Sequence, residues 1–324
     1  YVDLALNDRV RDVFRQRSMM IQSIRAFLQS LRYLEVETPT LQPIYGGANA
    51  RPFVTHHHAH GMELFLRISN ELYLKRCIIG GLERVYEFAR DFRNEGVDKT
   101  HSPEFTLLEF YEAYADYYVM MSRVEEIVVG AAEALGTGPT IEWDGKSINL
   151  ARPWKRLRFH EAIDLYADLD VSSLDPGELK RLCDQKSIEV PPDGSRGQIL
   201  IELFEQLVVS HLVDPHIIYD YPLESSPLCR KHRTHPELIE QFEVYIGGME
   251  VCNAYSELVD PDQQREAFEQ QAGFGRGKAE EVQPIDEDFL YALESGMPPT
   301  GGAGIGIDRL AMLLTNSNTI KDVL

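Results

Sequence analysis

The chain is predicted to form an α+β domain in which helices flank an antiparallel sheet. A long amphipathic helix pattern opens the sequence, strand patterns are scattered along it in adjacent pairs, and helical patterns separate the pairs. With 324 residues, 44% of them hydrophobic and 26% charged, the composition is that of an ordinary globular protein. The length fits one large domain that carries an inserted subdomain.

The first expected element is a helix of about six turns, because apolar residues recur there at spacings of three and four. An extended segment, 36–41, follows it. Pro39 within this segment biases Thr38 towards extended geometry, so the helix must end earlier. The apolar positions of the helix are Val10, Val13, Phe14, Met20, Ile21, Ile24, Phe27, Leu28 and Leu31.

Two strands are expected next, over residues 85–95 and 104–112. The loop between them, 96–103, begins with Gly and ends with Pro. Residues 119–136 have a helical pattern. The chain therefore offers a strand pair that one helix can cover.

The stretch 171–214 is mostly helical in pattern and is taken as an inserted helical subdomain. Residues 241–258 alternate like two paired strands around Gly247-Gly248. A short apolar helix over 307–314 follows a glycine-rich approach.

Charge and cysteine usage narrow the class of protein. The net charge of −20 repels nucleic acid, so RNA would be held by something absent here or by a local patch. The four cysteines are far apart and form no CxxC pair, which argues against a zinc site or disulfides. No stretch approaches the roughly 18 apolar residues of a membrane span, and no signal peptide pattern opens the chain. We expect a cytoplasmic protein with no membrane association.

The expected hairpin carries a first candidate site. Residues two apart in a strand share a face, so Arg93 and Glu95 should point together. The partner strand should present a second set on one face, and the loop adds Lys99 and His101, a cationic turn suited to a triphosphate. The alternative is a solvated face with ordinary cross-strand ion pairs. The partner-strand set is Phe105, Leu107, Glu109 and Tyr111.

The strand pair around Gly247-Gly248 carries a second candidate site. Glu243 and Glu250 lie on either side of the turn, and carboxylates gathered there repel one another unless cations separate them. Mg²⁺ or a ligand ammonium would serve. The alternative is an exposed acidic edge strand. The residues that share parity on the second strand are Asn253, Tyr255 and Glu257.

The glycine-rich run 301–306, followed by Arg309, is a third candidate. It lacks the third glycine of a dinucleotide-binding fingerprint and the Gly-Lys-Ser/Thr ending of a Walker A loop. Neither a dinucleotide-binding site nor a Walker A loop is therefore predicted. It offers close backbone approach to a ligand and then an arginine at a helix start; a glycine-rich turn without a ligand is the alternative. His56, His58 and His60 would share one strand face, but we do not expect them to bind a metal.

Taken together and in this order, the segments resemble a known family. Residues 92–96 with 101–105 resemble motif 2 of class II aminoacyl-tRNA synthetases in its lysyl form, and residues 304–310 resemble motif 3. The helix that ends in Val-Glu-Thr-Pro resembles motif 1, and residues 71–76 and 253–258 resemble lysyl-specific segments. The resemblance implies one catalytic domain over 1–324 and a homodimer formed through motif 1. Its parts would be motif 1 at about 10–43, motif 2 at about 85–112, the insertion at about 171–214 and motif 3 at about 301–314.

The same resemblance implies attack of the lysine carboxylate on the α-phosphorus of ATP, with Arg93 and Arg309 as the catalytic residues. Arg93 would bridge the carboxylate and the α-phosphate, and Arg309 would pair with the γ-phosphate. Mg²⁺ would be held by Glu243 and Glu250. The implied ATP-binding residues are Arg93, Glu95, His101, Phe105, Glu243 and Arg309.

The implied amino-acid substrate is L-lysine. Its ε-ammonium is costly to bury unless it is paired and hydrogen-bonded, and glutamates with a tyrosine hydroxyl would supply that pairing. Glu71 would hold the α-amino group, and Tyr255 would lie along the aliphatic stem. The implied lysine-binding residues are Glu71, Glu109, Tyr111, Asn253, Tyr255, Glu257 and Gly304.

The acceptor of the activated lysine is open at this point. Lysyl-tRNA synthetases carry an N-terminal OB-fold that reads the anticodon, and no segment here is typical of that barrel. We expect transfer to the acceptor end of tRNA-Lys. One alternative is a stand-alone ligase of the elongation factor P type, which joins lysine or β-lysine to a protein lysine. Those enzymes typically carry Ala at the position of Gly304, which favours α-lysine here. A second alternative is a non-catalytic lysine- or nucleotide-binding paralogue.

Overall fold

An eight-stranded sheet forms the centre of the computed structural model, which describes residues 1–274 and 284–324. The strand pairs from β5 to β10 are antiparallel, and the parallel pairs, β1 with β5 and β9 with β10, lie at the two edges. The predicted antiparallel α+β fold is confirmed. In spatial order the strands are β1 (Leu34–Glu35), β5 (Arg84–Phe92), β6 (Glu104–Ala113), β13 (Thr300–Gly306), β12 (Met249–Ser256), β11 (Leu238–Ile246), β10 (His216–Pro222) and β9 (Lys155–Arg158).

Two smaller sheets and a set of helices complete the described part of the chain. One small sheet joins β2 (Leu41–Gln42), β4 (Met62–Leu66) and β3 (Val54–His57), and the other is the hairpin of β7 (Thr140–Trp143) and β8 (Lys146–Asn149). The helices are α1 (Val2–Leu6), α2 (Asp8–Ser30), α3 (Glu71–Ile79), α4 (Tyr117–Ala134), α5 (Phe159–Ala167), α6 (Pro176–Lys186), α7 (Arg196–Leu207), α8 (Pro261–Phe274), α9 (Glu287–Glu294) and α10 (Ile307–Thr315), with short 3-10 turns η1 (Val209–His211), η2 (Leu223–Ser225) and η3 (Ile320–Asp322).

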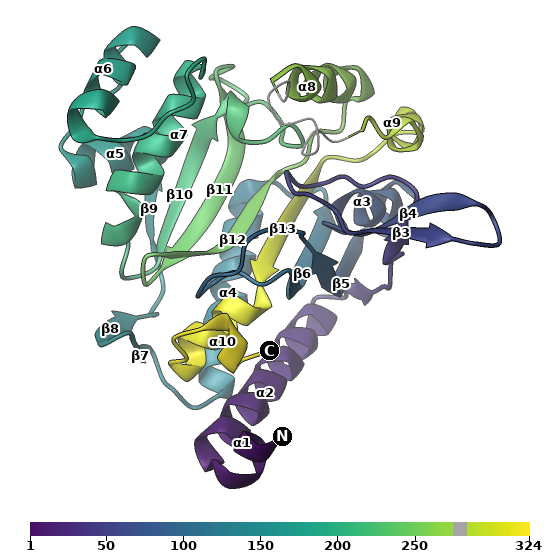
Figure 1. Ribbon diagram of the computed structural model, residues 1–324, viewed down its shortest axis with the longest axis vertical. Coiled ribbons are helices and arrows are strands. Elements are labelled where there is room, and N and C mark those ends of the chain that lie inside the picture. The colour runs from purple at the N-terminus through teal and green to yellow at the C-terminus, as the bar shows by residue number, and fades with distance from the viewer. Residues whose placement is uncertain (275–283) are drawn as a thin grey trace.

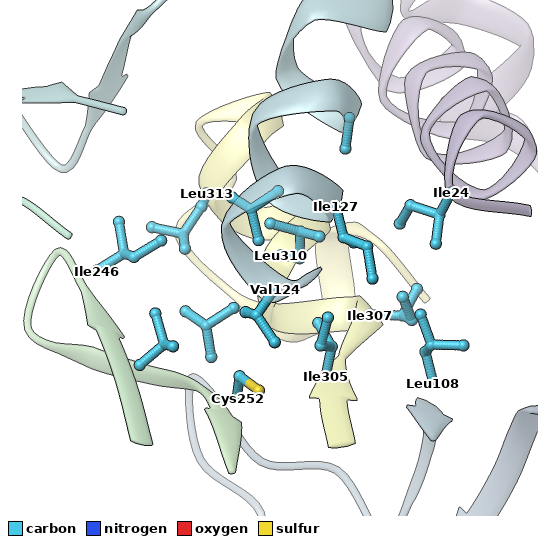
Figure 2. Close-up of a cluster of buried hydrophobic side chains, with 14 of the residues drawn as sticks. Ile24, Leu108, Val124, Ile127, Ile246, Cys252, Ile305, Ile307, Leu310 and Leu313 are labelled. Carbon is cyan, nitrogen blue, oxygen red and sulfur yellow. The ribbon is translucent and has the colours of Figure 1, made fainter. Parts of the chain in front are cut away.

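One face of the sheet packs on α2, α4 and α10. Figure 2 shows Ile24 of α2 and Ile127 of α4 converging with Leu310 of α10 on side chains from the strands. The strand residues in this core alternate along each strand, as period-two geometry requires. They include Leu108 and Phe110 of β6, Val244 of β11, Cys252 and Ala254 of β12, and Ala303 and Ile305 of β13.

The residues at the intervening positions point to the opposite face. That face has its own buried cluster, in which Tyr111 and Tyr255 lie with side chains from α3, α5, α7 and α9. Figure 1 shows α5, α6 and α7 grouped beside β9 and β10, whereas α3, β3 and β4 lie on the other side of the molecule, near β5 and β6. The middle of this second face, over β6, β13 and β12, is where a site has room to form.

The strand pair around Gly247-Gly248 is present as predicted, as β11 and β12. Both turn glycines have positive φ, 67° and 77°, the geometry that a two-residue hairpin turn requires. The predicted first helix is α2, whose N-cap Asn7 side chain accepts a hydrogen bond from the backbone N–H of Arg9. The predicted helix 119–136 is α4, and helices α6 and α7 lie within 171–214.

One local prediction was wrong. The strand expected over 85–95 ends at Phe92, so Arg93 and Glu95 lie in a loop, and strand parity does not govern them. The glycine-rich run 301–306, for which a turn was the alternative, is a strand, β13, with β6 and β12 hydrogen-bonded on its two sides. Glycine weakens a strand because it has no side chain to pack. The hydrogen bonds that β13 makes with β6 and β12 on its two sides offset this weakness. Among the described residues, no helix combines the length and the apolar character needed to cross a membrane.

Candidate active site

A cavity of about 440 Å³ opens over β6, β13 and β12, a volume in the usual range of small-molecule sites. It gathers nearly all of the predicted site residues from segments far apart in the chain. Glu243 and Lys99 are not among the residues that line it. The predicted residues that do are Glu71, Arg93, Glu95, His101, Phe105, Glu109, Tyr111, Glu250, Asn253, Tyr255, Glu257, Gly304 and Arg309.

The strand register explains how β6, β13 and β12 build the floor of this cavity. Glu109 of β6 pairs with Gly304 of β13, which pairs with Asn253 of β12, and Asn253 pairs with Glu243 of β11. The next row on the same face is Tyr111, Gly302, Tyr255 and Gln241. Because glycines occupy the central strand in both rows, the side chains on either side border a hollow.

Gly302 cannot be replaced without disturbing the cavity wall. A Cβ atom built there would overlap the Glu257 carboxylate and come within 2.5 Å of the Tyr111 ring. At Gly304 the same atom would lie 3.7 Å from Glu109 Cγ, an ordinary contact. Gly302 is therefore required by the packing around it, whereas Gly304 leaves space that belongs to the cavity.

Three buried glutamates line one end of the cavity. Glu109 accepts hydrogen bonds from the Tyr111 hydroxyl at 2.8 Å and the Ser69 hydroxyl at 3.3 Å. Glu71, at the start of α3, accepts from the Tyr255 hydroxyl at 2.6 Å. Glu257 follows β12 directly, is 2% exposed and forms an ion pair with Lys75 of α3. This end is strongly acidic and removed from water.

Burial raises the pKa of two carboxyl groups at this end, those of Glu109 and Glu257. Burial raises the pKa of Glu109 well above its usual range, and the nearby charges of Glu71 and Asp91 add to the effect. Burial also raises the pKa of Glu257 to about 8, although the Lys75 ammonium opposes the shift. A cationic ligand would be stabilised here because it supplies the charge that the carboxylates need.

Cationic side chains occupy the other end. The Arg93 guanidinium lies over the ring of Phe105, 5.1 Å from its centroid. Arg309 of α10 donates from Nη2 to His101 Nε2 at 2.9 Å and from Nη1 to the backbone carbonyl of Glu250 at 2.8 Å. Its Nη1 also lies 3.3 Å from Glu250 Oε2. Two arginines and a histidine thus face the cavity where a polyphosphate could bind.

Asp98 organises the loop that carries His101, although no sequence motif indicated a role for it. Its carboxylate accepts from the backbone N–H groups of Thr100 at 2.7 Å and His101 at 2.8 Å, and it lies 2.8 Å from His101 Nδ1. The Thr100 N–H is the main cause of the lowered pKa of Asp98, about 2. With Nδ1 turned to Asp98, Nε2 of the ring is left to face Arg309.

Of the predicted metal pair, Glu250 follows the hairpin turn and lies beside Arg309, and Glu243 lies before the turn on β11. Glu243 accepts from the hydroxyls of Tyr221 at 2.8 Å and Tyr245 at 2.5 Å, and burial together with the Glu250 charge raises its pKa to about 8. Within residues 1–274 and 284–324, no cluster of three or more His, Cys, Asp or Glu side chains could hold a metal by itself. Two carboxylates beside a phosphate site suit Mg²⁺, which usually takes one or two carboxylates together with substrate oxygens.

Two buried polar residues of the site were missed. Lys75 lies within residues 71–76, which resemble a lysyl-specific segment, and its spacing of four from Glu71 on a helix was the available signal. Asp308, next to Arg309, is buried and accepts from the backbone N–H of Thr106 at 2.6 Å and from Arg17 of α2. No pattern in the sequence links Arg17 to Asp308, because the contact spans almost the whole chain.

The fold is that of the class II tRNA synthetases. The family model described as tRNA synthetases class II (D, K and N) matches residues 1–324, and the chain belongs to this family. The resemblance expected from the three motifs is thereby confirmed.

Three similar proteins have the same name, lysine–tRNA ligase. A lysine–tRNA ligase of Moorella thermoacetica is 50% identical over 326 residues, and the alignment covers 100% of this chain and 66% of that protein. Lysine–tRNA ligases of Porphyromonas gingivalis and Methanoculleus marisnigri are 48% and 49% identical, with 56% and 64% of their lengths covered. The chain thus spans about 56–66% of the length of these relatives.

Proposed function

We propose that this chain is the catalytic domain of a lysine–tRNA ligase: it activates L-lysine with ATP, releases pyrophosphate and passes the lysyl group to tRNA-Lys. The observation that carries the proposal is the polarity of one cavity. Three buried glutamates line one end, and Arg93, His101 and Arg309 line the other. A diamino acid suits the first end, and a nucleoside triphosphate suits the second.

The amino-acid end accounts for selectivity. Glu109, Tyr111 and Glu257 would surround the ε-ammonium, Glu71 would hold the α-ammonium, and Asn253 would meet the carboxylate. Tyr255 would cover the aliphatic stem. An uncharged side chain of similar length would leave buried carboxylates without a partner, and sites of this kind reject such analogues strongly.

Catalysis would rest on positioning and electrostatic stabilisation. Arg93, at the cationic end, has the planar fork that would bridge the attacking carboxylate and the α-phosphate. Arg309 and His101 would hold the γ-phosphate, Phe105 would stack on the adenine, and Glu95 would accept from its amino group. Charge that develops on the phosphoryl oxygens would thus meet fixed cations.

Mg²⁺ is the proposed metal, and Glu243 with Glu250 would hold it. When bound, it would neutralise charge on the phosphate oxygens. The hydroxyls of Tyr221 and Tyr245 orient Glu243 for this role. The Glu250 carboxylate stands next to Arg309, so that metal and guanidinium would serve the same phosphates.

The remaining partners are proposals of the same kind. The acceptor end of tRNA-Lys would reach the cavity, and a homodimer would form through the motif 1 segment, which here comprises α2 and β1. A role in translation would place the protein in the cytoplasm. The relatives named above support the tRNA acceptor over a protein-lysine acceptor.

Lysine-dependent exchange of pyrophosphate into ATP tests the activation step, with α-lysine and β-lysine compared side by side. We expect exchange with α-lysine, and charging of full-length tRNA-Lys then tests the acceptor. Absence of exchange with both isomers would refute the enzymatic function. A preference for β-lysine would refute the synthetase function.

Two variants separate the roles assigned to the two ends. Arg93→Ala should abolish exchange, whereas Glu109→Gln should mainly raise the KM for lysine. Arg90→Ala is the matched control, because Arg90 is an exposed arginine of β5 outside the cavity. The reverse pattern, loss of turnover in Glu109→Gln with a normal kcat in Arg93→Ala, would show that the roles are misassigned.

A further inference from the structure

Lys75 is a fully buried cation that the proposed reaction does not use. Its side chain is 0% exposed, and its Nζ lies 2.6 Å from Glu71 Oε1 and forms an ion pair with Glu257 Oε2. Burial alone would lower the pKa of Lys75, but Glu257 and Glu71 outweigh this and raise it, so the ammonium stays charged. An ammonium is costly to bury, and the two carboxylates are what retain it.

Lys75 engages one oxygen of each carboxylate. On Glu71 it shares Oε1 with the Tyr255 hydroxyl, which leaves Oε2 for another donor. On Glu257 its ion pair is with Oε2; both oxygens of this carboxylate are buried, and neither accepts a hydrogen bond from the described residues. Lys75 therefore fixes both side chains and leaves each with an oxygen for a ligand.

The charges at this end can be counted. When all three carboxyl groups are ionised, as a bound cation requires, Glu71, Glu109 and Glu257 bring three negative charges and Lys75 brings one positive charge. In that state the end carries two negative charges. The polar neighbours Tyr111, Tyr255 and Cys229 are neutral, since burial raises each pKa well above its usual value. Behind them, Arg67 is paired with both Glu87 at 2.8 Å and Asp91 at 3.2 Å. L-Lysine brings two ammonium groups, which matches the count.

We propose that Lys75 is an internal counter-ion that sets the charge of the amino-acid end to match a diamino acid and orients Glu71 and Glu257 for it. Lys75 is then a positioning residue that acts through two carboxylates and touches no substrate atom. This inference rests on the proposed function and names what makes the cavity select a ligand with two ammonium groups. A lysine that served only to hold the fold together would have no effect on which ligand charge is accepted.

Variants that remove one charge or both distinguish a positioning role of Lys75 from a purely structural role. Lys75→Met, Glu257→Gln and the double variant are compared by lysine-dependent pyrophosphate exchange, with the KM for lysine, the KM for ATP and kcat measured separately. Each single change unbalances the count by one charge, in opposite directions, and the double change restores it. Arg123→Met is the matched control, since it removes a cation from buried Glu112, outside the cavity.

Each single variant should raise the KM for lysine about tenfold or more, as expected when a buried charge loses its partner, with the KM for ATP unchanged. The double variant should have a KM for lysine at least about fivefold below that of Glu257→Gln, because the balance of charges is restored. The Arg123 control should change thermal stability without changing the KM for lysine.

The proposal is overturned if the double variant binds lysine no better than Glu257→Gln, or if Lys75→Met leaves the KM for lysine unchanged. It is also overturned if neither Lys75 variant folds, because Lys75 is then a structural residue. If only the double variant folds, its comparison with Glu257→Gln decides. Failure of the unmodified protein to exchange pyrophosphate with lysine would instead refute the proposed function.

Discussion

At Gly302 and Gly304, the lack of a side chain shapes the cavity. Both lie on β13 and face the cavity, between Glu109 and Tyr111 of β6 on one side and Asn253 and Tyr255 of β12 on the other. Only at Gly302 would an added Cβ atom overlap the neighbouring side chains. The two positions should therefore respond differently to the same substitution.

Gly302→Ala should raise the KM for lysine about tenfold or more, because the new methyl group displaces the Tyr111 ring and the Glu257 carboxylate. Gly304→Ala should fold normally and keep its KM for ATP, but favour β-lysine relative to α-lysine by filling cavity space. Pyrophosphate exchange with both isomers and thermal unfolding of both variants measure this. Equal effects at the two positions would contradict it.

The raised pKa of Glu257, about 8, makes a prediction for pH. The carboxylate form binds the substrate ammonium, so below this pKa a proton must leave when lysine binds. The KM for lysine at saturating ATP should therefore fall by up to about tenfold per pH unit as the pH rises towards 8, and then level off. In Glu257→Gln this dependence should be weakened. A KM that increases from pH 6 to pH 8 would refute the assignment.

At the scale of elements, Asp308 joins three segments that the sequence keeps far apart. It lies in the first turn of α10, accepts a hydrogen bond from the backbone of β6, and pairs with Arg17 of α2. Because Arg309 is its neighbour, this contact fixes the helix that presents Arg309 to the cavity. Its partner Arg17 also donates to Thr106 Oγ1 at 3.1 Å.

Arg17→Met should lower the free energy of unfolding by about 3 kcal/mol, because it removes the cation that neutralises a buried carboxylate. It should also raise the KM for ATP more than the KM for lysine. Arg15→Met is the control: its ion pair with Asp12 is exposed, and the expected loss is below about 1 kcal/mol. Denaturant unfolding and exchange kinetics test both; equal losses would contradict a special role for Arg17.

At the scale of the whole molecule, the net charge of the chain bears differently on lysine activation and on transfer of the lysyl group to tRNA. The chain carries a net charge of −20, so its surface as a whole repels RNA. The cavity, by contrast, encloses ligands whose charges it matches locally. Activation of lysine should therefore need nothing beyond this chain, whereas productive contact with tRNA should be weak.

The 324-residue chain should catalyse lysine-dependent pyrophosphate exchange, but charge tRNA-Lys only with a high KM for the tRNA. Lowering the ionic strength should strengthen tRNA binding only slightly, because few phosphates are neutralised. Filter binding over a range of salt concentrations, with a longer lysine–tRNA ligase as the reference, tests this. Tight and strongly salt-dependent binding by the chain would refute it.

The sequence by itself determined the fold class, the long helix α2, the hairpin of β11 and β12, and the family, because each depends on local periodicity or on motifs of fixed spacing. It also indicated most residues of the cavity, since side chains two apart on a strand share a face. Strand β9 and helix α3 were not predicted, because their patterns are too short to stand out. Strand β10 was not predicted because it is buried at nearly every position and shows no alternation.

Only the tertiary structure decided that the glycine run is a central strand, since a glycine strand forms when neighbours pair with it on both sides. It also decided that Arg93 and Glu95 lie in a loop yet face the cavity. The contacts of Lys75 with Glu257, and of Arg17 with Asp308, join residues nearly two hundred or more positions apart. Burial raises the cost of an unpaired charge, and burial arises only when the whole chain has folded.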